Sequence, residues 1–326
     1  MRSPVLLFLL SGLLAITGTL RAERLRVATY NLENYNLANR RVEGRGEPSY
    51  PKPEKEKAAL RRILHATNAD LVALQEIGGA DYVRELQRDL AREGLPYPHT
   101  AILAGPDTQR QLAIISRKPF ARIHPHARLP IRYQDKANEI SRGLLAVTLN
   151  TSAGKLTLYT LHLKSRITVE SSDPGAAARR LAEADTIRAL LHAAHAPEAA
   201  TALVILMGDF NDGPQSATLR QFTNARRQPV FHVLPARDSR GETWTYRNLR
   251  HEYYSRSDYI LHTPALGAYL RPPARIADIP DAHTASDHRL VCADMDFGDN
   301  ATAAGLKASK ASGTQGAATP RRPDRP

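Results

Sequence analysis

Short apolar runs alternate with stretches of helical periodicity along the middle of this chain. The apolar runs predict β-strands at residues 25–30, 71–74, 111–115, 144–149, 156–161, 202–207, 259–261 and 290–293. Apolar positions three and four apart predict helices at residues 54–65, 82–92, 176–194 and 214–222. Several strands are separated only by hairpin-length gaps, which favours a mixed sheet over a purely parallel one. We therefore expect a single α/β or α+β domain.

The two ends of the chain differ from this body. Arg2 precedes an apolar stretch over residues 5–20 and a small residue, Ala22, which is the pattern of a secretory signal peptide over residues 1–22. The stretch is shorter than the ~20 residues that span a bilayer comfortably, so an uncleaved anchor is the less favoured alternative. Residues 299–326 have the composition of a disordered basic tail. We expect a folded domain over residues 23–298 of a secreted or periplasmic protein, without a transmembrane segment after cleavage.

Net charge narrows the choice of partner only slightly. The 326 residues carry 45 Lys and Arg against 33 Asp and Glu, a formal charge of +12. The leader contributes +2 and the tail +3, so residues 23–298 keep +7. A basic body favours an anionic partner, and no stable protein partner is implied. The lone cysteine, Cys292, excludes an intramolecular disulfide framework and a multi-cysteine metal site.

Acidic and amide side chains stand where predicted strands begin or end. One such residue alone is usually a solvated turn residue or a cap. A set that converges at strand ends suits a hard divalent cation, because Mg²⁺ prefers oxygen ligands. The set consists of Asn31, Glu33, Glu76, Asp209, Asn211, Asp258 and Asp287, with His288 directly after the last of them.

Six short motifs occur in one order along the chain. They are Thr-Tyr-Asn at 29–31, Leu-Gln-Glu at 74–76, Leu-His-Leu-Lys-Ser at 161–165, Gly-Asp-Phe-Asn at 208–211, Ser-Asp-Tyr at 257–259 and Ser-Asp-His at 286–288. Together they resemble the endonuclease/exonuclease/phosphatase superfamily over residues 24–297. The resemblance implies the DNase I-like four-layer sandwich, in which two mixed β-sheets pack face to face with helices outside. It also implies metal-assisted hydrolysis of a phosphoester.

The resemblance implies a metal site built from carboxylates and one amide. Glu76 corresponds to the main metal ligand, and Asn31 and Asp287 lie near the ion, directly or through water. Glu33 corresponds to an acid that some members place near a second metal position. We expect Mg²⁺ as the cofactor, with Mn²⁺ or Ca²⁺ as alternatives.

The resemblance also implies the residues that act on the phosphate. Asp209 and Asn211 lie against the scissile phosphate and position the nucleophile and the phosphoryl oxygens. His288 contacts the phosphate, and Asp258 holds its ring through the other nitrogen. His162 matches the second histidine of the deoxyribonuclease and sphingomyelinase branches, although a lone histidine in a strand is more often a packed core residue.

Four further residues are predicted from their positions. The acid that orients the second histidine in the deoxyribonuclease branch has no obvious match, and Asp107 is our choice because it precedes the strand at 111–115. Arg142 and Lys164, at the edges of neighbouring strands, are expected to bind phosphate, with surface ion pairing as the alternative. Trp244 is expected to form an aromatic wall for the substrate, unless it only packs.

The sequence indicates the substrate less directly than it indicates the type of reaction. The basic body, the predicted export and the similarity of segment 161–165 to extracellular nucleases favour DNA or RNA, cleaved by in-line attack of an activated water. A sphingomyelinase-like enzyme or a small-molecule phosphodiesterase or phosphatase is the main alternative, because the fold alone does not select among phosphoesters. A non-catalytic anion-binding module is a remote alternative, since the full set of site residues is present.

Overall fold

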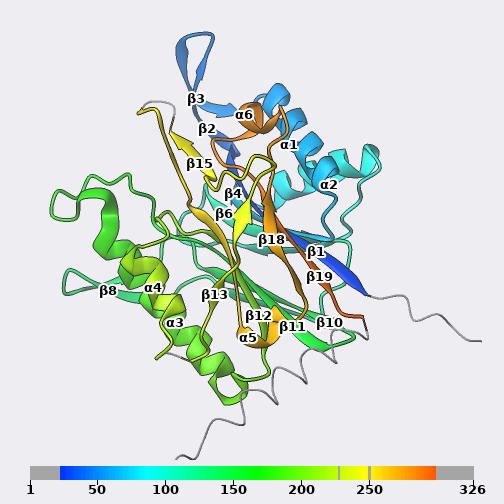
Figure 1. Ribbon diagram of the computed structural model, residues 1–326. Coiled ribbons are helices and arrows are strands. Elements are labelled where there is room, and N and C mark those ends of the chain that lie inside the picture. The colour runs from blue at the N-terminus through cyan, green and yellow to red at the C-terminus, as the bar shows by residue number, and fades with distance from the viewer. Residues whose placement is uncertain (1–22, 227, 249–250, 299–326) are drawn as a thin grey trace, which may run out of the picture.

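The computed structural model describes residues 23–226, 228–248 and 251–298, and in them two large β-sheets lie face to face (Figure 1). In spatial order the first sheet contains β14 (Ala236–Arg237), β18 (Leu270–Ile276), β19 (Val291–Asp296), β1 (Arg24–Tyr35), β4 (Leu71–Ile77), β6 (Gln111–Ser116) and β5 (His99–Leu103). The second contains β13 (His232–Val233), β17 (Asp258–His262), β12 (Leu203–Asp209), β11 (Gly154–His162), β10 (Leu144–Thr151) and β7 (Arg122–His126). Both sheets are mixed, because β1 is parallel to β4 and β11 to β12, while the other large pairings are antiparallel.

Helices cover the outer faces of the two sheets (Figure 1). Those on the first sheet are α1 (Glu54–Thr67), α2 (Ala80–Arg92) and α6 (Ala282–Ala285), and those on the second are α3 (Ala177–His195) and α4 (Ala217–Thr223). The short helices are α5 (Pro264–Gly267), η1 (Pro174–Ala176) and η2 (Ala196–Glu198). Three small hairpins pair β2 (Leu37–Val42) with β3 (Arg45–Pro51), β8 (Pro130–Tyr133) with β9 (Lys136–Glu139), and β15 (Tyr246–Asn248) with β16 (Tyr253–Ser255). This arrangement confirms the predicted four-layer sandwich.

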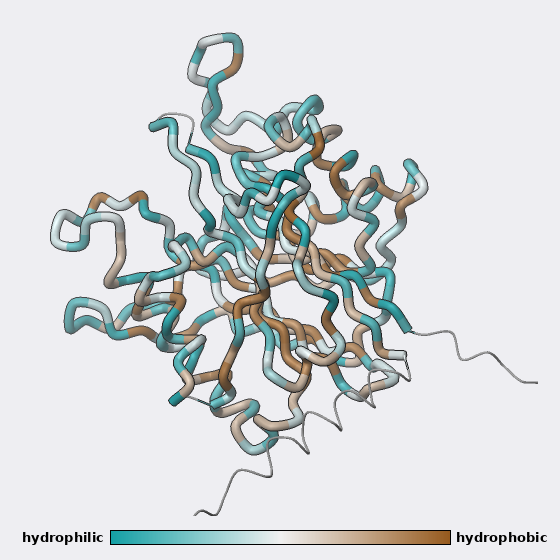
Figure 2. Tube along the Cα trace, in the orientation of Figure 1, coloured by the Kyte–Doolittle hydropathy of each residue, from teal (hydrophilic) through white to brown (hydrophobic). Residues whose placement is uncertain are grey.

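Three apolar layers hold the sandwich together. Alternate residues of the strands, such as Val27, Ala73, Leu158 and Met207, meet between the two sheets. The other face of each sheet packs on its own helices, which makes two outer apolar clusters. The central strands are therefore apolar on both faces and read as continuous hydrophobic runs. Figure 2 shows this hydrophobic colour concentrated in the middle of the molecule and a polar rim around it.

Each predicted strand and helix coincides with an observed one to within a few residues. The hairpins and the strands β5, β7, β13, β14 and β18 were not predicted, and one of these hairpins, β2–β3, projects from the body of the molecule (Figure 1). The predicted leader at 1–22 and tail at 299–326 lie outside the described residues. Across the part of the chain that the structure describes, no helix is long and apolar enough to cross a membrane.

The space between the sheets changes from apolar to polar towards one end of the strands. Gln75 is fully buried there and joins the two sheets, because it accepts a bond from Thr29 Oγ1 at 3.2 Å and donates to Thr160 Oγ1 at 3.0 Å. Beyond this polar layer, the same inward faces carry Asn31 on β1 and His162 on β11. The fold thus brings the polar strand ends of both sheets together.

Candidate active site

Three side chains from neighbouring strands of the second sheet lie in one row. His162 at the end of β11 pairs in register with Asp209 of β12, and Asp209 pairs with Asp258 of β17. Residues in one row of a sheet point to the same face, so all three point between the sheets. Gly208, with φ +141°, precedes Asp209, and a Cβ at this position would clash with the carbonyl oxygen of Leu161. The Gly-Asp pair of the motif therefore reflects the close approach of β11 and β12.

Glu76 enters the site from the first sheet through an irregularity in β4. The pairing register of β4 with β6 shifts between Gln75 and Ile77, and Glu76 lies there with φ 60°. A β-bulge of this kind turns a side chain away from the regular alternation. The Glu76 Oε2 atom accepts a hydrogen bond from the backbone N–H of Asn34 at 3.0 Å. Glu33 and Asn34 also have positive φ, so both chain segments are bent where they meet.

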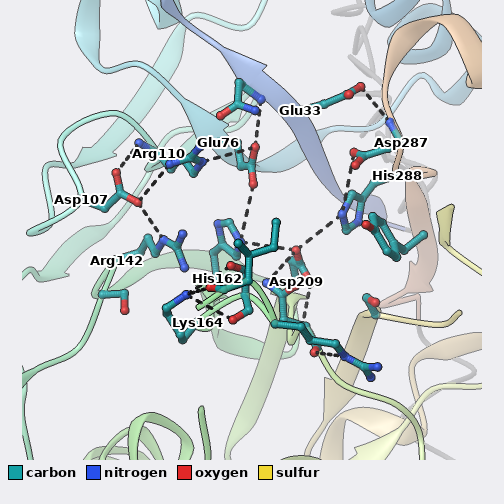
Figure 3. Close-up of a pocket in the computed structure, with 18 of the residues that line it drawn as sticks. Glu33, Glu76, Asp107, Arg110, Arg142, His162, Lys164, Asp209, Asp287 and His288 are labelled. Carbon is teal, nitrogen blue, oxygen red and sulfur yellow. Dashed lines mark hydrogen bonds and ion pairs between the residues drawn. The ribbon is translucent and has the colours of Figure 1, made fainter. Parts of the chain in front are cut away.

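These side chains border an open cavity of about 690 Å³ (Figure 3). In the close-up, Arg110, Asp107 and Arg142 lie on one side, Asp287 and His288 on the other, and Asp209 between them. The cavity brings together ten residues predicted from the sequence: Glu33, Glu76, Asp107, Arg142, His162, Lys164, Asp209, Asn211, Asp287 and His288. Asn31 and Asp258 are buried directly behind them and reach the cavity through Asp209 and His288.

The His288 ring is held by a carboxylate behind it. Its Nδ1 lies 2.8 Å from Asp258 Oδ2, and its Nε2 faces the cavity 3.7 Å from Asp209 Oδ2. Burial alone would lower the pKa of His288, but the charges of Asp258 and Asp209 raise it well above its ordinary value. The Asp258–His288 pair predicted from the sequence is therefore formed, with Nε2 directed to the cavity.

The His162 ring has no such partner. Its Nε2 lies 3.4 Å from Asp209 Oδ2 and 3.8 Å from Glu76 Oε1, and its buried Nδ1 has no hydrogen-bond partner among the described residues. Burial, and then the charge of Arg142, hold the pKa of His162 well below its ordinary value. The choice of Asp107 as the acid that orients His162 was wrong, because Asp107 Oδ2 instead accepts a bond from Arg142 Nε at 3.2 Å.

Asp209 lies between the two histidines and is fixed by amides. Asn31 Nδ2 donates to its Oδ2 at 3.0 Å, and the backbone N–H of Asn211 donates to its Oδ1 at 2.8 Å. Asn211 has φ 52°, and its side chain also donates to the carbonyl of Leu163 at 3.0 Å. Burial raises the pKa of Asp209 to about 7. A carboxyl with such a pKa can exchange a proton near neutrality.

Two groups of side chains could hold a cation. Within the described residues, Asp209, Asp258 and His288 place one donor atom each within 4.8 Å of one another, but the contact between Asp258 and His288 already engages an atom of each. The carboxylates of Glu33, Glu76 and Asp287 line the same cavity and form an oxygen-rich alternative, although their oxygens do not all lie within 4.8 Å of one another. Burial raises the pKa of Asp287 to about 7, with further contributions from Glu33 and Glu76. A divalent cation would relieve this repulsion between carboxylates, so the carboxylate group fits Mg²⁺ better.

Trp244 does not line the cavity, and the prediction that it forms a substrate wall was wrong. Its ring packs against Tyr254 at 4.7 Å between centroids, and the Arg289 guanidinium lies 4.1 Å over it. Two tyrosines of the adjacent hairpin, Tyr246 and Tyr253, line the cavity instead. The sequence shows that this segment is aromatic, but it does not show which of the rings the hairpin directs into the cavity.

Arginines that the sequence did not single out stand beside the predicted basic residues. Arg110 Nε lies 4.0 Å from Glu76 Oε2, and Arg166 lies 3.5 Å from Asp212 at the rim. Arg142 is almost fully buried and Lys164 is partly buried, so neither is an ordinary surface ion pair. The side of the cavity that carries His162 is therefore also its cationic side.

Comparisons with known proteins agree with this architecture. A family model described as the Endonuclease/Exonuclease/phosphatase family matches residues 28–288. The human Nocturnin catalytic domain with bound sulfate is similar with a TM-score of 0.58 and 17% identity, over 84% of this chain and 96% of that one. Sphingomyelinase C from Streptomyces griseocarneus has a TM-score of 0.55 and 18% identity, over 84% and 99% of the two chains. At such identities the likeness concerns the fold alone. No curated protein matches this chain.

Proposed function

This chain belongs to the endonuclease/exonuclease/phosphatase family, whose members are phosphoric ester hydrolases, and we propose that it is an exported, divalent-metal-dependent phosphodiesterase that cleaves DNA or RNA. One observation carries the proposal. The buried Asp258–His288 pair directs His288 Nε2 towards Asp209 at the edge of a cavity that is lined by carboxylates on one side and by cations on the other.

The reaction proposed is an in-line attack of water on a phosphodiester. Asp209, fixed by Asn31 and Asn211, orients the water and takes its proton. His288, kept cationic by Asp258, donates from Nε2 to a phosphoryl oxygen, where negative charge grows in the transition state. The water oxygen bonds to phosphorus while the bond to the leaving oxygen breaks, so no covalent enzyme intermediate forms.

A bound divalent cation would neutralise phosphoryl and leaving-group charge at this site. Glu76, Asn31 and Asp287 are the residues that would hold it, with Glu33 near a second position. Burial raises the pKa of Glu33, which indicates that this carboxylate also lacks sufficient compensating charge from the protein. Arg142 and Lys164 would bind phosphate oxygens that the cation does not contact, those of a neighbouring phosphate included.

Nucleic acid is favoured by the distribution of charge. Residues 23–298 carry +7 although they include the acids of the site, and four cationic side chains line the cavity. A specific observation supports the lipid alternative, because Ile167 and Val169 are 84% and 105% exposed in the loop at the rim. A sphingomyelinase-like activity is therefore the second candidate, and the assay includes its substrate.

The test is an assay of the mature protein with Mg²⁺, Mn²⁺ or Ca²⁺ against plasmid, single-stranded DNA, RNA, sphingomyelin and bis(p-nitrophenyl) phosphate. We expect cleavage of DNA or RNA that stops in EDTA and falls by about 10²- to 10⁴-fold in His288→Ala. Exposed His232, at the other end of β17 from Asp258, gives the matched control His232→Ala. Full activity in EDTA or in His288→Ala would disprove the mechanism. Mass spectrometry of the protein from the medium should find Glu23 first; an intact leader would contradict export.

A further inference from the structure

Two tyrosines that the proposed mechanism does not use line the cavity beside His288. Tyr246 begins β15 and forms an isolated bridge with His288, and their ring centroids lie 4.8 Å apart. Tyr253 begins β16, and its ring centroid lies 6.1 Å from that of Tyr246. Both belong to the His288 side of the cavity. Tyr253 is 36% exposed and contributes to none of the three apolar clusters, so its ring is accessible from the cavity.

The neighbouring residue gives an internal comparison. Tyr254 follows Tyr253 on β16, and successive side chains of a strand point to opposite faces. Tyr254 packs on Trp244 and does not line the cavity. Tyr253, whose ring neighbour Tyr246 also lines the cavity, therefore presents its ring there, whereas Tyr254 packs on Trp244 outside the cavity.

The opposite side of the cavity carries an excess of positive charge. Arg110, Arg142, Lys164 and Arg166 line it. Asp107 is shared between Arg142 at 3.2 Å and Arg110 at 3.8 Å, so one carboxylate serves two guanidinium groups. Burial and the charge of Arg142 lower the pKa of Lys164, although Glu183 opposes this. An anion on this side would relieve that repulsion.

We propose that Tyr246 and Tyr253 form a stacking surface for a nucleobase, and that Arg110, Arg142, Lys164 and Arg166 hold a phosphate adjacent to the scissile one. This inference rests on the proposed phosphodiesterase function and assigns its substrate class. A base and two successive phosphates are present together in a polynucleotide. Stacking on a side chain requires an accessible base, so the substrate is a single strand or a frayed strand end rather than an intact duplex.

A phosphocholine headgroup is the competing ligand for two tyrosines. Quaternary ammonium groups bind over aromatic faces, and Asp287 would add a nearby negative charge. A choline phosphodiester, however, has one phosphate and a neutral lipid on the other side, so it offers the four cations no second phosphate. The cationic side therefore favours the nucleotide, and the experiment includes the choline ligand as a separate outcome.

The experiment compares two adjacent tyrosines on two matched oligonucleotides. One is a single-stranded ten-nucleotide DNA, and the other has the same backbone with abasic tetrahydrofuran sugars at every position. In Tyr253→Ala we expect kcat/KM to fall about 5- to 100-fold on the first oligonucleotide and less than twofold on the second, because only the first has bases to stack. Tyr254→Ala should leave both values unchanged, and Tyr253→Phe should retain most of the activity.

Binding in EDTA separates this inference from the proposed function, because it needs no turnover. Fluorescence anisotropy with the labelled oligonucleotides should show the same selective loss of affinity in Tyr253→Ala. If wild type cleaves no oligonucleotide but binds the base-containing one through Tyr253, the proposed function fails and the stacking surface stands. Equal losses on both oligonucleotides, or no loss, would overturn the inference. It is also overturned if Tyr253→Ala weakens only binding of phosphocholine.

Discussion

The two histidines of the cavity make a comparison within one site. His162 and His288 are both nearly fully buried, and each directs Nε2 to the same oxygen of Asp209, at 3.4 and 3.7 Å. They differ at Nδ1, because His288 has Asp258 at 2.8 Å and His162 has no hydrogen-bond partner among the described residues. Their pKa values accordingly shift in opposite directions, upward for His288 and downward for His162.

The comparison shows that a second carboxylate, rather than burial, decides what each ring can do. A neutral ring without an acceptor at Nδ1 keeps its proton on Nε2 and can serve as a hydrogen-bond donor. A ring paired with a carboxylate stays cationic and carries a full charge to the phosphate. The predictions below alter one side of the pair at a time.

The largest effect is expected from Asp258→Asn, which removes the carboxylate charge that distinguishes the surroundings of His288 from those of His162. The amide keeps the shape but loses the charge, so the pKa of His288 should fall towards that of His162, and kcat should fall about 10²- to 10⁴-fold. NMR titration of the ring protons and steady-state kinetics measure the two quantities. Asp89→Asn, in an ion pair with exposed Arg88 away from the cavity, is the control. An unchanged His288 titration would show that Asp258 does not supply the charge.

A smaller effect is expected from His162→Ala. A neutral donor to a charged phosphate contributes about 1.5–3 kcal/mol, so kcat should fall roughly 10- to 150-fold. His162→Gln, whose amide N–H can take the place of Nε2–H, should recover part of that loss. A loss in His162→Ala larger than in Asp258→Asn, measured on the same substrate, would reverse the ranking of the two histidines.

The smallest effect on turnover is expected from Glu183→Gln. Glu183 supports the backbone behind the His162 side of the cavity. Glu183 is fully buried and accepts from the backbone N–H groups of Ser141 at 2.9 Å and Lys164 at 2.7 Å, next to Arg142 and His162. The amide leaves one N–H without an acceptor, at a cost of about 1–3 kcal/mol. Urea unfolding should show this loss, with KM raised a few-fold and kcat unchanged.

Exposed Glu170 provides the control for that experiment, as Glu170→Gln. If Glu183→Gln changed kcat and left KM and stability unaltered, Glu183 would not be a positioning residue for the cationic side. That outcome would mean that substrate binding on the His162 side depends only on the residues that line the cavity.

The strand-end residues could be predicted because their geometry follows from local pattern. His162, Asp209 and Asp258 each stand next to an apolar strand, and two-residue periodicity fixes the face to which each side chain points. The order of the motifs then supplied the fold, since six short segments are hard to match in sequence by chance. Nothing comparable identifies the projecting β2–β3 hairpin, which has no buried residue and whose sequence is largely polar, so it lacks the alternation of apolar and polar residues that marks a strand.

The roles predicted for Asp107 and Trp244 were wrong because other side chains of the protein contact these two residues. Asp107 is near enough to the cavity to be considered, but the Arg142 guanidinium occupies its carboxylate. Trp244 is held away from the substrate by Arg289, which is itself bonded to buried Asp238 at 2.7 Å. Such choices depend on tertiary neighbours 35 or more residues away, such as Arg142 for Asp107, and no local sequence pattern records them.

Gly208 has a consequence for how the enzyme would lose activity. Because a Cβ on Gly208, with its φ of +141°, would meet the carbonyl oxygen of Leu161, glycine keeps β12 in register with β11 here. The spacing of His162 and Asp209 is therefore set by the ~4.8 Å separation of neighbouring strands and not by a loop. Heating below the unfolding transition should not increase the distance between these two residues gradually. They separate only when the sheet itself opens, so thermal inactivation should be as cooperative as global unfolding.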